Sequence, residues 1–443
     1  MLISLVALGM AFLSLHPEQR SYWSAFPFDG FVPENGVGVH DPSICDFDGH
    51  YVCLNTNGNG FGMMRTSTDL IHWHVDGPVL PATPDWLQKA MPQHRSIWAP
   101  EAIRHGRDGL RMYYCASAAF GHNNSWIGVA ECPHFNLLKP TDGWIDLGLI
   151  IDSKEGRDNF NAIDPSILVD AKGRQWMFFG SYWSGLYVAE LDPTTGKLLH
   201  SDRSDMTLVA RNPLDKANGI EAASAVYRDG FYYLFANYGL AAQGVRSTYQ
   251  IVVGRSASPN GPFVDSQGRT MVEGGHEDVL KTSSPMFGPG GGAAFRDSKG
   301  RWLLSLHYYD GRKPWHGQVW GVPTLQVRDL LWSPDGWPLP GLPIMPESNE
   351  LNRHPQKSPV GHWRHQGDFG AVSEVDIRRD GTFEIEGKRR GKWSRTGDEL
   401  KLTWDPDSAF TDTVQLAYAG NYYIGRNTSN QIIRGVRVGR RSR

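Results

Sequence analysis

Short apolar and aromatic runs, separated by turns that contain glycine, dominate the pattern of hydrophobic and polar positions along this chain. Five segments share one arrangement, in which an opening residue is followed by a short apolar strand, a Gly turn and an aromatic strand. They begin at Asp41, Ala99, Asp164, Glu221 and Gly290. Asp-Gly and Lys-Gly turns between such runs are strong signals for β-hairpins. Because no stretch shows a long period of 3.6 residues, we expect little helix.

A second pair of strands follows each hairpin, as at residues 60–77, 185–199 and 249–265. Successive units begin about 58, 65, 57 and 69 residues apart. Such self-similarity is the sequence signature of a repeat architecture. Four strands per unit and five units predict an all-β fold, a five-bladed β-propeller over residues 30–342.

The last part of the chain has a different pattern. Residues 343–443 contain short alternating runs separated by Gly turns, which predict a small antiparallel β-barrel. A Pro-rich connector at residues 333–361 joins the two parts. Because such segments are typical of linkers, we place a domain boundary near residue 345.

Charge adds a second contrast between the two parts. The whole chain carries 44 Lys+Arg and 47 Asp+Glu, a net charge of −3, so bulk charge gives no reason to expect a nucleic-acid or membrane partner. Residues 351–443, however, hold 17 Lys+Arg against 11 Asp+Glu, whereas residues 1–350 hold 27 against 36. An acidic propeller is therefore joined to a basic barrel. The 50 Gly, 16 Trp, 16 Tyr and 19 Phe residues suit short strands and surfaces that stack on sugars.

The N-terminal residues 2–15 are apolar without interruption, which is too short for a comfortable bilayer span and resembles the core of a secretory signal peptide. We therefore expect a signal peptide over residues 1–20 and a secreted or periplasmic monomer. A misassigned start or a buried N-terminal segment is the alternative, because no Lys or Arg precedes the run. The four cysteines, Cys45, Cys53, Cys115 and Cys132, lack zinc-site spacing. We expect buried free thiols, with a disulfide as the alternative.

The predicted propeller brings distant acidic residues together. The first strand of each blade lines the central axis, so the residues that open these strands converge at one mouth of the channel. Asp41, Asp164 and Glu221 should therefore meet there. Three carboxylates in an aromatic-lined funnel suit either calcium binding or glycoside hydrolysis by an acid and a base. Capping of strand starts by Asp is the structural alternative for any one of them.

A resemblance narrows these uses. A series of short motifs occurs in order along residues 35–340: His40-Asp41-Pro42-Ser43, Trp98-Ala99-Pro100-Glu101, Phe120-Gly121 with Ser125-Trp126-Ile127-Gly128, Asn161-Ala162-Ile163-Asp164-Pro165, Gly180-Ser181-Tyr182-Trp183, Ile220-Glu221-Ala222, Ser247-Thr248-Tyr249, Gly254-Arg255-Ser256 and His307-Tyr308-Tyr309-Asp310. With these motifs the chain resembles glycoside hydrolase family 43, and most of all its endo-α-1,5-L-arabinanase branch.

The resemblance implies an inverting mechanism on arabinan. Asp41 matches the general base, Glu221 the general acid, and Asp164 the residue that tunes the pKa of the acid. In an inverting enzyme, acid and base lie roughly 6.5–9.5 Å apart to leave room for a water. The resemblance also implies four substrate-binding residues and one metal residue. These are Trp98, Phe120, Asn161 and Ser181 for the sugar, and His307 for an axial calcium that it holds largely through water.

Three departures from the family pattern put fine specificity in doubt. Ala222-Ala223 stands where Ala-Pro is usual, 241–244 (AAQG) lacks a common cysteine pair, and 290–292 (GGG) replaces a common Gly-His. Two alternatives stay open for the propeller: an exo-acting α-L-arabinofuranosidase or β-xylosidase, and a non-catalytic sugar-binding module. The barrel is similar to the C-terminal domain of some extracellular arabinanases. Its basic charge could help the protein to approach acidic pectin. The alternative is a stabilising module whose arginines are only solvated.

Overall fold

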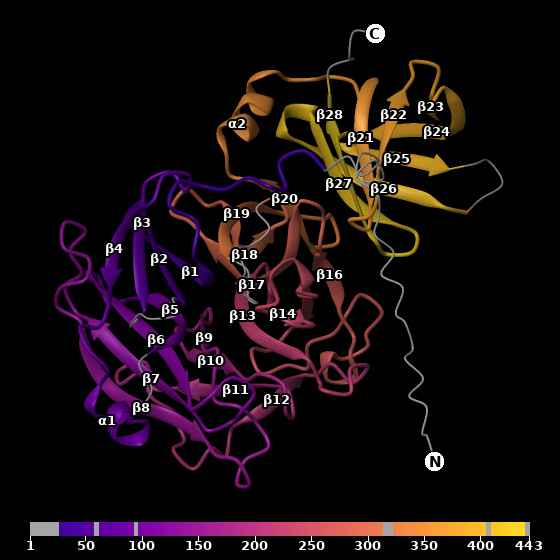
Figure 1. Cartoon of the computed structure of the whole chain (residues 1–443). Helices are drawn as coiled ribbons and strands as arrows, with labels where there is room; N and C mark the ends of the chain where they lie inside the picture. Colours follow the sequence, from indigo (N-terminus) through magenta and orange to yellow (C-terminus); the bar gives the residue numbers. More distant parts are fainter. Residues whose placement is uncertain (1–25, 57–61, 93–95, 313–321, 405–408, 439–443) are drawn as a thin grey trace, which may run out of the picture.

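Five four-stranded antiparallel sheets follow one another along the chain and form the blades of a propeller (Figure 1). The computed structural model describes residues 26–56, 62–92, 96–312, 322–404 and 409–438. Blade 1 consists of β1 (His40–Phe47), β2 (His50–Thr56), β3 (Met63–Ser67) and β4 (His74–Pro78). Blade 2 consists of β5 (Trp98–His105), β6 (Gly109–Ser117), β7 (Ser125–Cys132) and β8 (Ile145–Ser153).

The other three blades repeat this order. Blade 3 consists of β9 (Ser166–Val169), β10 (Gln175–Phe179), β11 (Leu186–Leu191) and β12 (Thr207–Ala210). Blade 4 consists of β13 (Ile220–Arg228), β14 (Phe231–Tyr238), β15 (Gln250–Ser256) and β16 (Glu277–Leu280). Blade 5 consists of β17 (Met286–Arg296), β18 (Trp302–Asp310), β19 (Pro323–Trp332) and β20 (Pro338–Pro343).

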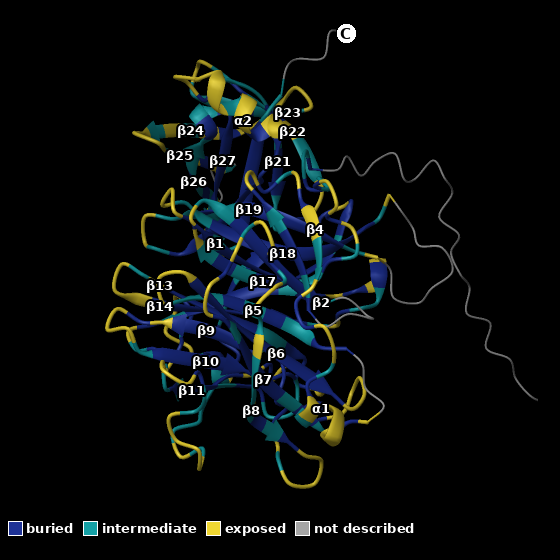
Figure 2. Cartoon of the chain, turned by 90° about the vertical axis from the view of Figure 1, so that its left-hand side faces the viewer, coloured by how far each residue is buried: buried dark blue, intermediate teal, exposed yellow. Residues whose placement is uncertain are grey.

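The first strands of the blades form the inner ring. Each of β1, β5, β9, β13 and β17 packs against the first strand of the next blade, and β17 returns to β1. Four of these strands are largely buried and β5 is mostly half-buried, whereas exposed residues concentrate in the connecting loops (Figure 2). The prediction of a five-bladed propeller is confirmed.

A closed eight-stranded antiparallel barrel follows the propeller. Its strands are β21 (Gly361–Gly367), β22 (Val372–Ile377), β23 (Thr382–Ile385), β24 (Lys388–Thr396), β25 (Glu399–Trp404), β26 (Thr411–Ala417), β27 (Tyr422–Asn427) and β28 (Ile432–Arg437). The predicted boundary near residue 345 lies between the end of β20 and the start of β21. The prediction of a small antiparallel barrel is also confirmed.

The predicted scarcity of helix holds in the described residues. The α-helices there are α1 (Asp85–Ala90) and α2 (Pro346–Arg353), and the 3₁₀ turns are Gly244–Arg246, Met271–Glu273 and Tyr418–Gly420. Of the helices in this part of the chain, none is long and apolar enough to cross a membrane. All four cysteines are buried and free, as expected. The expected signal peptide at residues 1–20 lies outside the described residues.

The barrel and the propeller share one hydrophobic core. Tyr422, Ile424 and Val436 of the barrel belong to the same buried cluster as Leu306 and Leu339 of blade 5. Burying apolar area stabilises by roughly 25 cal/mol per Å², so a shared core couples the two parts energetically.

Polar groups complete this interface. Asp29, which precedes β1, is fully buried and accepts hydrogen bonds from Arg328 of β19 at 2.5 Å and from Nη1 of Arg434 of β28 at 3.0 Å. Phe26 and Phe369 lie against the Arg434 guanidinium, at 4.0 and 4.8 Å from its carbon to the ring centroids. One carboxylate therefore ties the N-terminal segment, blade 5 and the barrel together.

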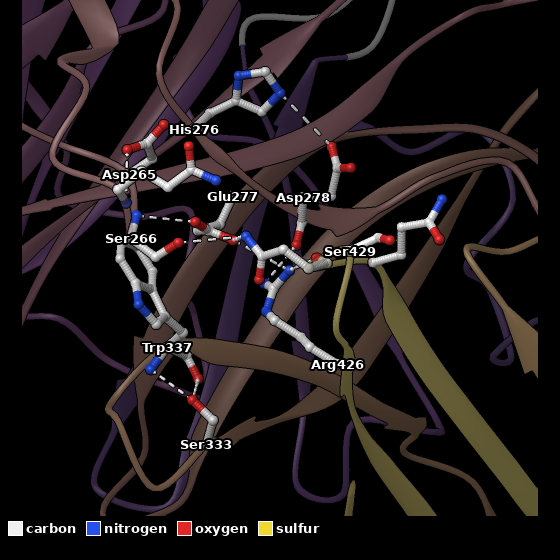
Figure 3. A network of polar contacts seen from close by, with 12 residues as sticks. Asp265, Ser266, His276, Glu277, Asp278, Ser333, Trp337, Arg426 and Ser429 are labelled. Carbon is white, nitrogen blue, oxygen red and sulfur yellow. Dashed lines mark hydrogen bonds and ion pairs between the residues drawn. The ribbon is translucent and has the colours of Figure 1, made fainter. Parts of the chain in front are cut away.

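A second polar network lies at the edge of blade 4 (Figure 3). Glu277 of β16 accepts hydrogen bonds from the backbone N–H of Ser266 at 2.9 Å and from the Asn430 amide at 2.5 Å. Arg426 of β27 lies 3.3 Å from the Glu277 carboxylate and donates to the carbonyl of Asp278 at 2.9 Å. The barrel is thus fixed to two blades.

Candidate active site

A repeated backbone irregularity shapes the inner ring. One residue with positive φ recurs at or near the start of each first strand: Asp41 (47°), Ala99 (38°), Asp164 (56°), Ala222 (51°) and Gly291 (58°); β17 has a second one in Gly288 (54°). In β1, β5, β13 and β17 the pairing register shifts at the same place. Bulges of this kind re-aim side chains, and positive φ in residues other than glycine is strained backbone that clusters at functional sites. All five residues line one small cavity on the axis.

The ladder registers also correct the sequence alignment of the repeat. Asp41 and Asp164 occupy the positive-φ position, whereas Glu221 lies one residue before it, at the ladder position of His40 and Trp98. The three carboxylates therefore converge, but the acid of blade 4 comes from a neighbouring position of the ring.

A cavity of about 760 Å³ opens above this ring. Its lining includes all the predicted acids and all four predicted sugar contacts. These residues are Asp41, Asp164 and Glu221, with Trp98, Phe120, Asn161 and Ser181. The cavity has the size of an ordinary small-molecule site. His307 is fully buried beside Asp41, outside the lining of this cavity.

Asp41 lies beside two imidazoles and a hydroxyl donor. Its Oδ2 accepts a hydrogen bond from the Thr56 hydroxyl at 2.8 Å and lies 2.8 Å from Nδ1 of His40. Burial alone would raise the pKa of Asp41, but His40, His307 and Thr56 outweigh burial and lower it to about 2. Asp41 is therefore ionised at neutral pH, as a general base must be.

Asp164 and Glu221 have the opposite electrostatic setting. Burial first, and then the carboxylates of Glu221 and Asp41, raise the pKa of Asp164 well above its usual value. Burial also raises the pKa of Glu221, against hydrogen bonds from Ser181 and Tyr249 that favour its charged form. Because like charges this close do not both ionise readily, the pair retains a proton where an isolated carboxyl would have lost it.

The backbone of blade 3 is held by a thiol and an amide. The N–H of Asp164 donates to Sγ of Cys115 at 3.3 Å, and the same thiol donates to the carbonyl of Trp98 at 3.3 Å. The Asp164 carboxylate accepts a hydrogen bond from the N–H of Ala222, beside Glu221, at 3.2 Å. The buried thiol thus joins a predicted sugar platform to a predicted catalytic residue.

The predicted sugar contacts differ in exposure. Phe120 is 71% exposed, so its ring presents a flat apolar face at the mouth. Asn161 and Ser181 are buried, and Oδ1 of Asn161 has no hydrogen-bond partner among the described residues. A buried acceptor in the wall of the cavity can accept a hydrogen bond from a sugar hydroxyl. Ser181 instead donates to Glu221 at 2.6 Å.

His307 provides the test for calcium. His40, Asp41 and His307 form a cluster whose potential ligand atoms lie within 4.8 Å of one another. Calcium prefers six to eight oxygen ligands, so two imidazoles and one carboxylate do not fit direct ligation. Nε2 of His307, however, is buried without a hydrogen-bond partner in the described structure, and burial lowers the pKa of His307 well below its usual value. Nδ1 of this neutral imidazole accepts a hydrogen bond from the N–H of Asp41 at 3.2 Å, so Nε2 carries the proton. A vacant N–H donor can bind the oxygen of a water, which fits a hydrated calcium held through water.

Sequence reasoning assigned no role to several residues of this site. Tyr249 donates a hydrogen bond to Oε1 of Glu221, and His40 and Thr56 contact Asp41. Tyr249 and His40 occur in the strings that carry the family resemblance, so that signal was present. Their partners became visible only when β1, β2, β13 and the start of β15 were placed around one axis.

Comparisons with known proteins identify a matching family model and similar proteins. A family model described as "Glycosyl hydrolases family 43" matches residues 36–338. The chain is 32% identical over 337 residues to the extracellular endo-α-(1→5)-L-arabinanase 1 of Bacillus subtilis, covering 75% of this chain and 94% of that protein. It is 33% identical over 309 residues to the extracellular exo-α-(1→5)-L-arabinofuranosidase of Cellvibrio japonicus, covering 68% and 86%.

One solved structure also includes a counterpart of the barrel. The endo-1,5-α-L-arabinanase from Thermotoga petrophila superposes with a TM-score of 0.73, covering 92% of this chain and 100% of that chain at 22% identity. This likeness concerns the fold, and it extends over propeller and barrel together.

Proposed function

Because the chain belongs to glycosyl hydrolase family 43, we propose that it hydrolyses internal α-1,5-L-arabinofuranosidic bonds of arabinan with inversion of configuration. The observation that carries this proposal is one cavity in which an ionised Asp41 lies with a proton-retaining Glu221–Asp164 pair. Acid and base groups in opposite protonation states are what glycoside hydrolysis requires.

The proposed mechanism assigns one task to each carboxyl. Asp41 takes a proton from a water, whose oxygen bonds to the anomeric carbon as the glycosidic bond breaks. Glu221 gives its proton to the departing sugar oxygen, which leaves as a hydroxyl. Asp164 has the task of keeping the acid protonated and in place, because two carboxylates in one site repel each other when both are charged and Asp164 accepts a hydrogen bond from the N–H of Ala222, next to Glu221. Trp98, Phe120, Asn161 and Ser181 line the subsites around the cleaved bond.

Product sizing tests the endo assignment. Linear α-1,5-arabinan should yield a falling series of oligosaccharides, and proton NMR should show an inverted anomeric centre in the first product. Release of arabinose alone would instead favour the exo-acting alternative, which the similarity to the Cellvibrio japonicus protein supports. A retained configuration would reject the inverting mechanism.

The dependence of kcat/KM on pH should follow from the different pKa values of Asp41 and Glu221. Activity requires Asp41 ionised, which holds above its pKa of about 2, and Glu221 protonated, which holds below its raised pKa. We expect an alkaline limb above the ordinary Glu pKa of about 4.3. Asp164→Asn removes the like charge, so the alkaline limb should move to lower pH in that variant. An unchanged limb would contradict the role of Asp164.

We further propose that His307 holds a hydrated calcium near the propeller axis. When bound, the ion supplies positive charge close to Asp41. Calcium added to chelator-treated protein should raise the melting temperature, because a ligand that binds only the folded state stabilises it. The His307→Gln variant should lose this rise, whereas an equal rise in the variant would place calcium elsewhere.

We also propose a secreted monomer. The names of the two curated relatives describe them as extracellular, and residues 1–20 carry the predicted signal peptide. Mass spectrometry of protein recovered from the culture medium of the native host tests the proposed export: absence of residues 1–20 supports it, and an intact N-terminus overturns it.

A further inference from the structure

Both oxygens of the Glu221 carboxyl are held by hydroxyl groups. Oε2 accepts a hydrogen bond from Ser181 at 2.6 Å, and Oε1 accepts one from the phenol of Tyr249. Two donors on opposite oxygens block rotation of the carboxyl plane. Ser181 is already assigned to the sugar, but the proposed mechanism gives no task to Tyr249.

Tyr249 reaches Glu221 because of a missing side chain in the next blade. Its ring is 3% exposed and lies directly on Gly290 of β17. A Cβ atom at position 290 would lie 1.9 Å from Cδ2 of this ring, which no side chain could accommodate without displacing Tyr249. The Tyr249 ring can occupy this place only because residue 290 has no side chain.

The ladder register gives this glycine a particular meaning. Gly290 pairs with His307 as Glu221 pairs with Asn237, and in both strands the pairing shifts immediately afterwards. Position 290 of blade 5 is thus the counterpart of the acid in blade 4. Where blade 4 carries the acid, blade 5 carries no side chain, and Tyr249 fills the space.

We propose that Tyr249 is a positioning residue that fixes the carboxyl of the general acid Glu221, and that Gly290 is the position that admits it. This inference rests on the proposed function of Glu221. A phenol suits the task because it donates one hydrogen bond and bears no charge. Burial, and then the nearby carboxylates, raise the pKa of Tyr249 well above its usual value, so it keeps its proton.

Several other titratable groups surround this pair. Asp41 and His40 act on Glu221 from blade 1, Asp164 acts on both members from blade 3, and Tyr182 faces Glu221 from the loop after β10. From β18, Tyr309 feels the charge of Glu221, and the ring centroid of His307 lies 6.1 Å from that of Tyr249. None of these groups changes when only the phenol oxygen is removed, so one substitution isolates its effect.

The Tyr249→Phe variant tests the inference. We expect kcat on arabinan to fall about 10- to 100-fold, as for the loss of one hydrogen bond to a charged group, with KM nearly unchanged. The alkaline limb of the kcat/KM profile should move to higher pH, because a hydrogen bond to the ionised form of Glu221 is lost. The matched control is Tyr238→Phe in the same blade, whose hydroxyl donates to the carbonyl of Arg211 instead. Its kinetics should be those of the wild type.

A double-mutant cycle separates positioning from a merely structural role. In a Glu221→Gln background, Tyr249→Phe should cost little further activity, because its target is gone. Gly290→Ala should reproduce the kinetic loss, and adding it to Tyr249→Phe should give much less than the product of the two effects. Equal losses with and without Glu221, or an unmoved alkaline limb, would overturn the inference.

These comparisons are ratios to the wild type on whichever arabinofuranoside it hydrolyses. A wild type inactive on linear arabinan but active on an aryl arabinofuranoside would therefore defeat the proposed substrate without deciding the role of Tyr249.

Discussion

The Glu221→Gln variant should lose activity on linear arabinan by about 10²- to 10⁴-fold, the usual contribution of general acid catalysis. Glutamine keeps the shape of the side chain but has no acidic proton for the leaving oxygen. Initial rates of reducing-sugar release give the measurement. The loss should be much smaller on aryl arabinosides whose leaving group needs no proton, because only poor leaving groups depend on the acid.

The control for this loss is Glu347→Gln on α2, which removes an exposed carboxylate outside the cavity. It should leave the kinetics unchanged. A Glu221→Gln enzyme with full activity on arabinan would show that another group protonates the leaving oxygen.

The Asp29→Ala variant should lower the free energy of unfolding by about 3–5 kcal/mol, because it leaves the guanidinium groups of Arg328 and Arg434 buried without their counter-charge. Urea titration of the whole chain measures this. The matched control is Asp48→Ala: Asp48 is 74% exposed and pairs with Arg104 at 3.2 Å. An exposed pair of this kind contributes about 0–1 kcal/mol.

The shared core also predicts that unfolding in urea is a single cooperative transition. Propeller and barrel should unfold together in the wild type, since Tyr422 and Leu339 belong to one cluster. In the Asp29→Ala variant the urea concentration at the midpoint should fall, but unfolding should remain a single transition. Two separate transitions in the wild type, or a loss no larger than that of Asp48→Ala, would show that the buried carboxylate does not couple the two parts.

Local signals were sufficient for the blades. Each hairpin is encoded by a turn and two runs close in sequence, so the order of strands and their number per blade could be predicted from patterns alone. The convergence of Asp41, Asp164 and Glu221 followed from that topology, without any knowledge of side-chain contacts.

Register was harder to predict. The positions of Asp41 and Glu221 differ by one residue in their ladders because the shift falls after His40 in β1 and after Glu221 in β13. Such a bulge adds a residue without any signature in hydrophobic alternation. The repeat therefore indicated which segments meet, but not which residue of each segment faces the axis.

Hydrogen-bond partners that are far apart in the sequence could not be predicted from it. Arg328 and Arg434 are 106 residues apart by their numbers, and each meets Asp29 from a different part of the fold. Nothing local distinguishes these two arginines from solvated ones. The basic charge of the barrel was correctly counted, but Arg426 and Arg434 contact the propeller side of the interface and not solvent alone.

At the five positive-φ positions of the inner ring, the backbone sets where a side chain points, and the residue type alone sets its chemistry. The same backbone kink recurs around a fivefold pseudo-symmetric axis, so a catalytic asymmetry arises only from which side chains occupy equivalent places. Ala99 and Gly291 line the axial cavity with almost no chemistry of their own. Single substitutions at these positions can change the chemistry of the site while the loops and blades keep their structure. The residues around the propeller axis are therefore the natural targets for redesign.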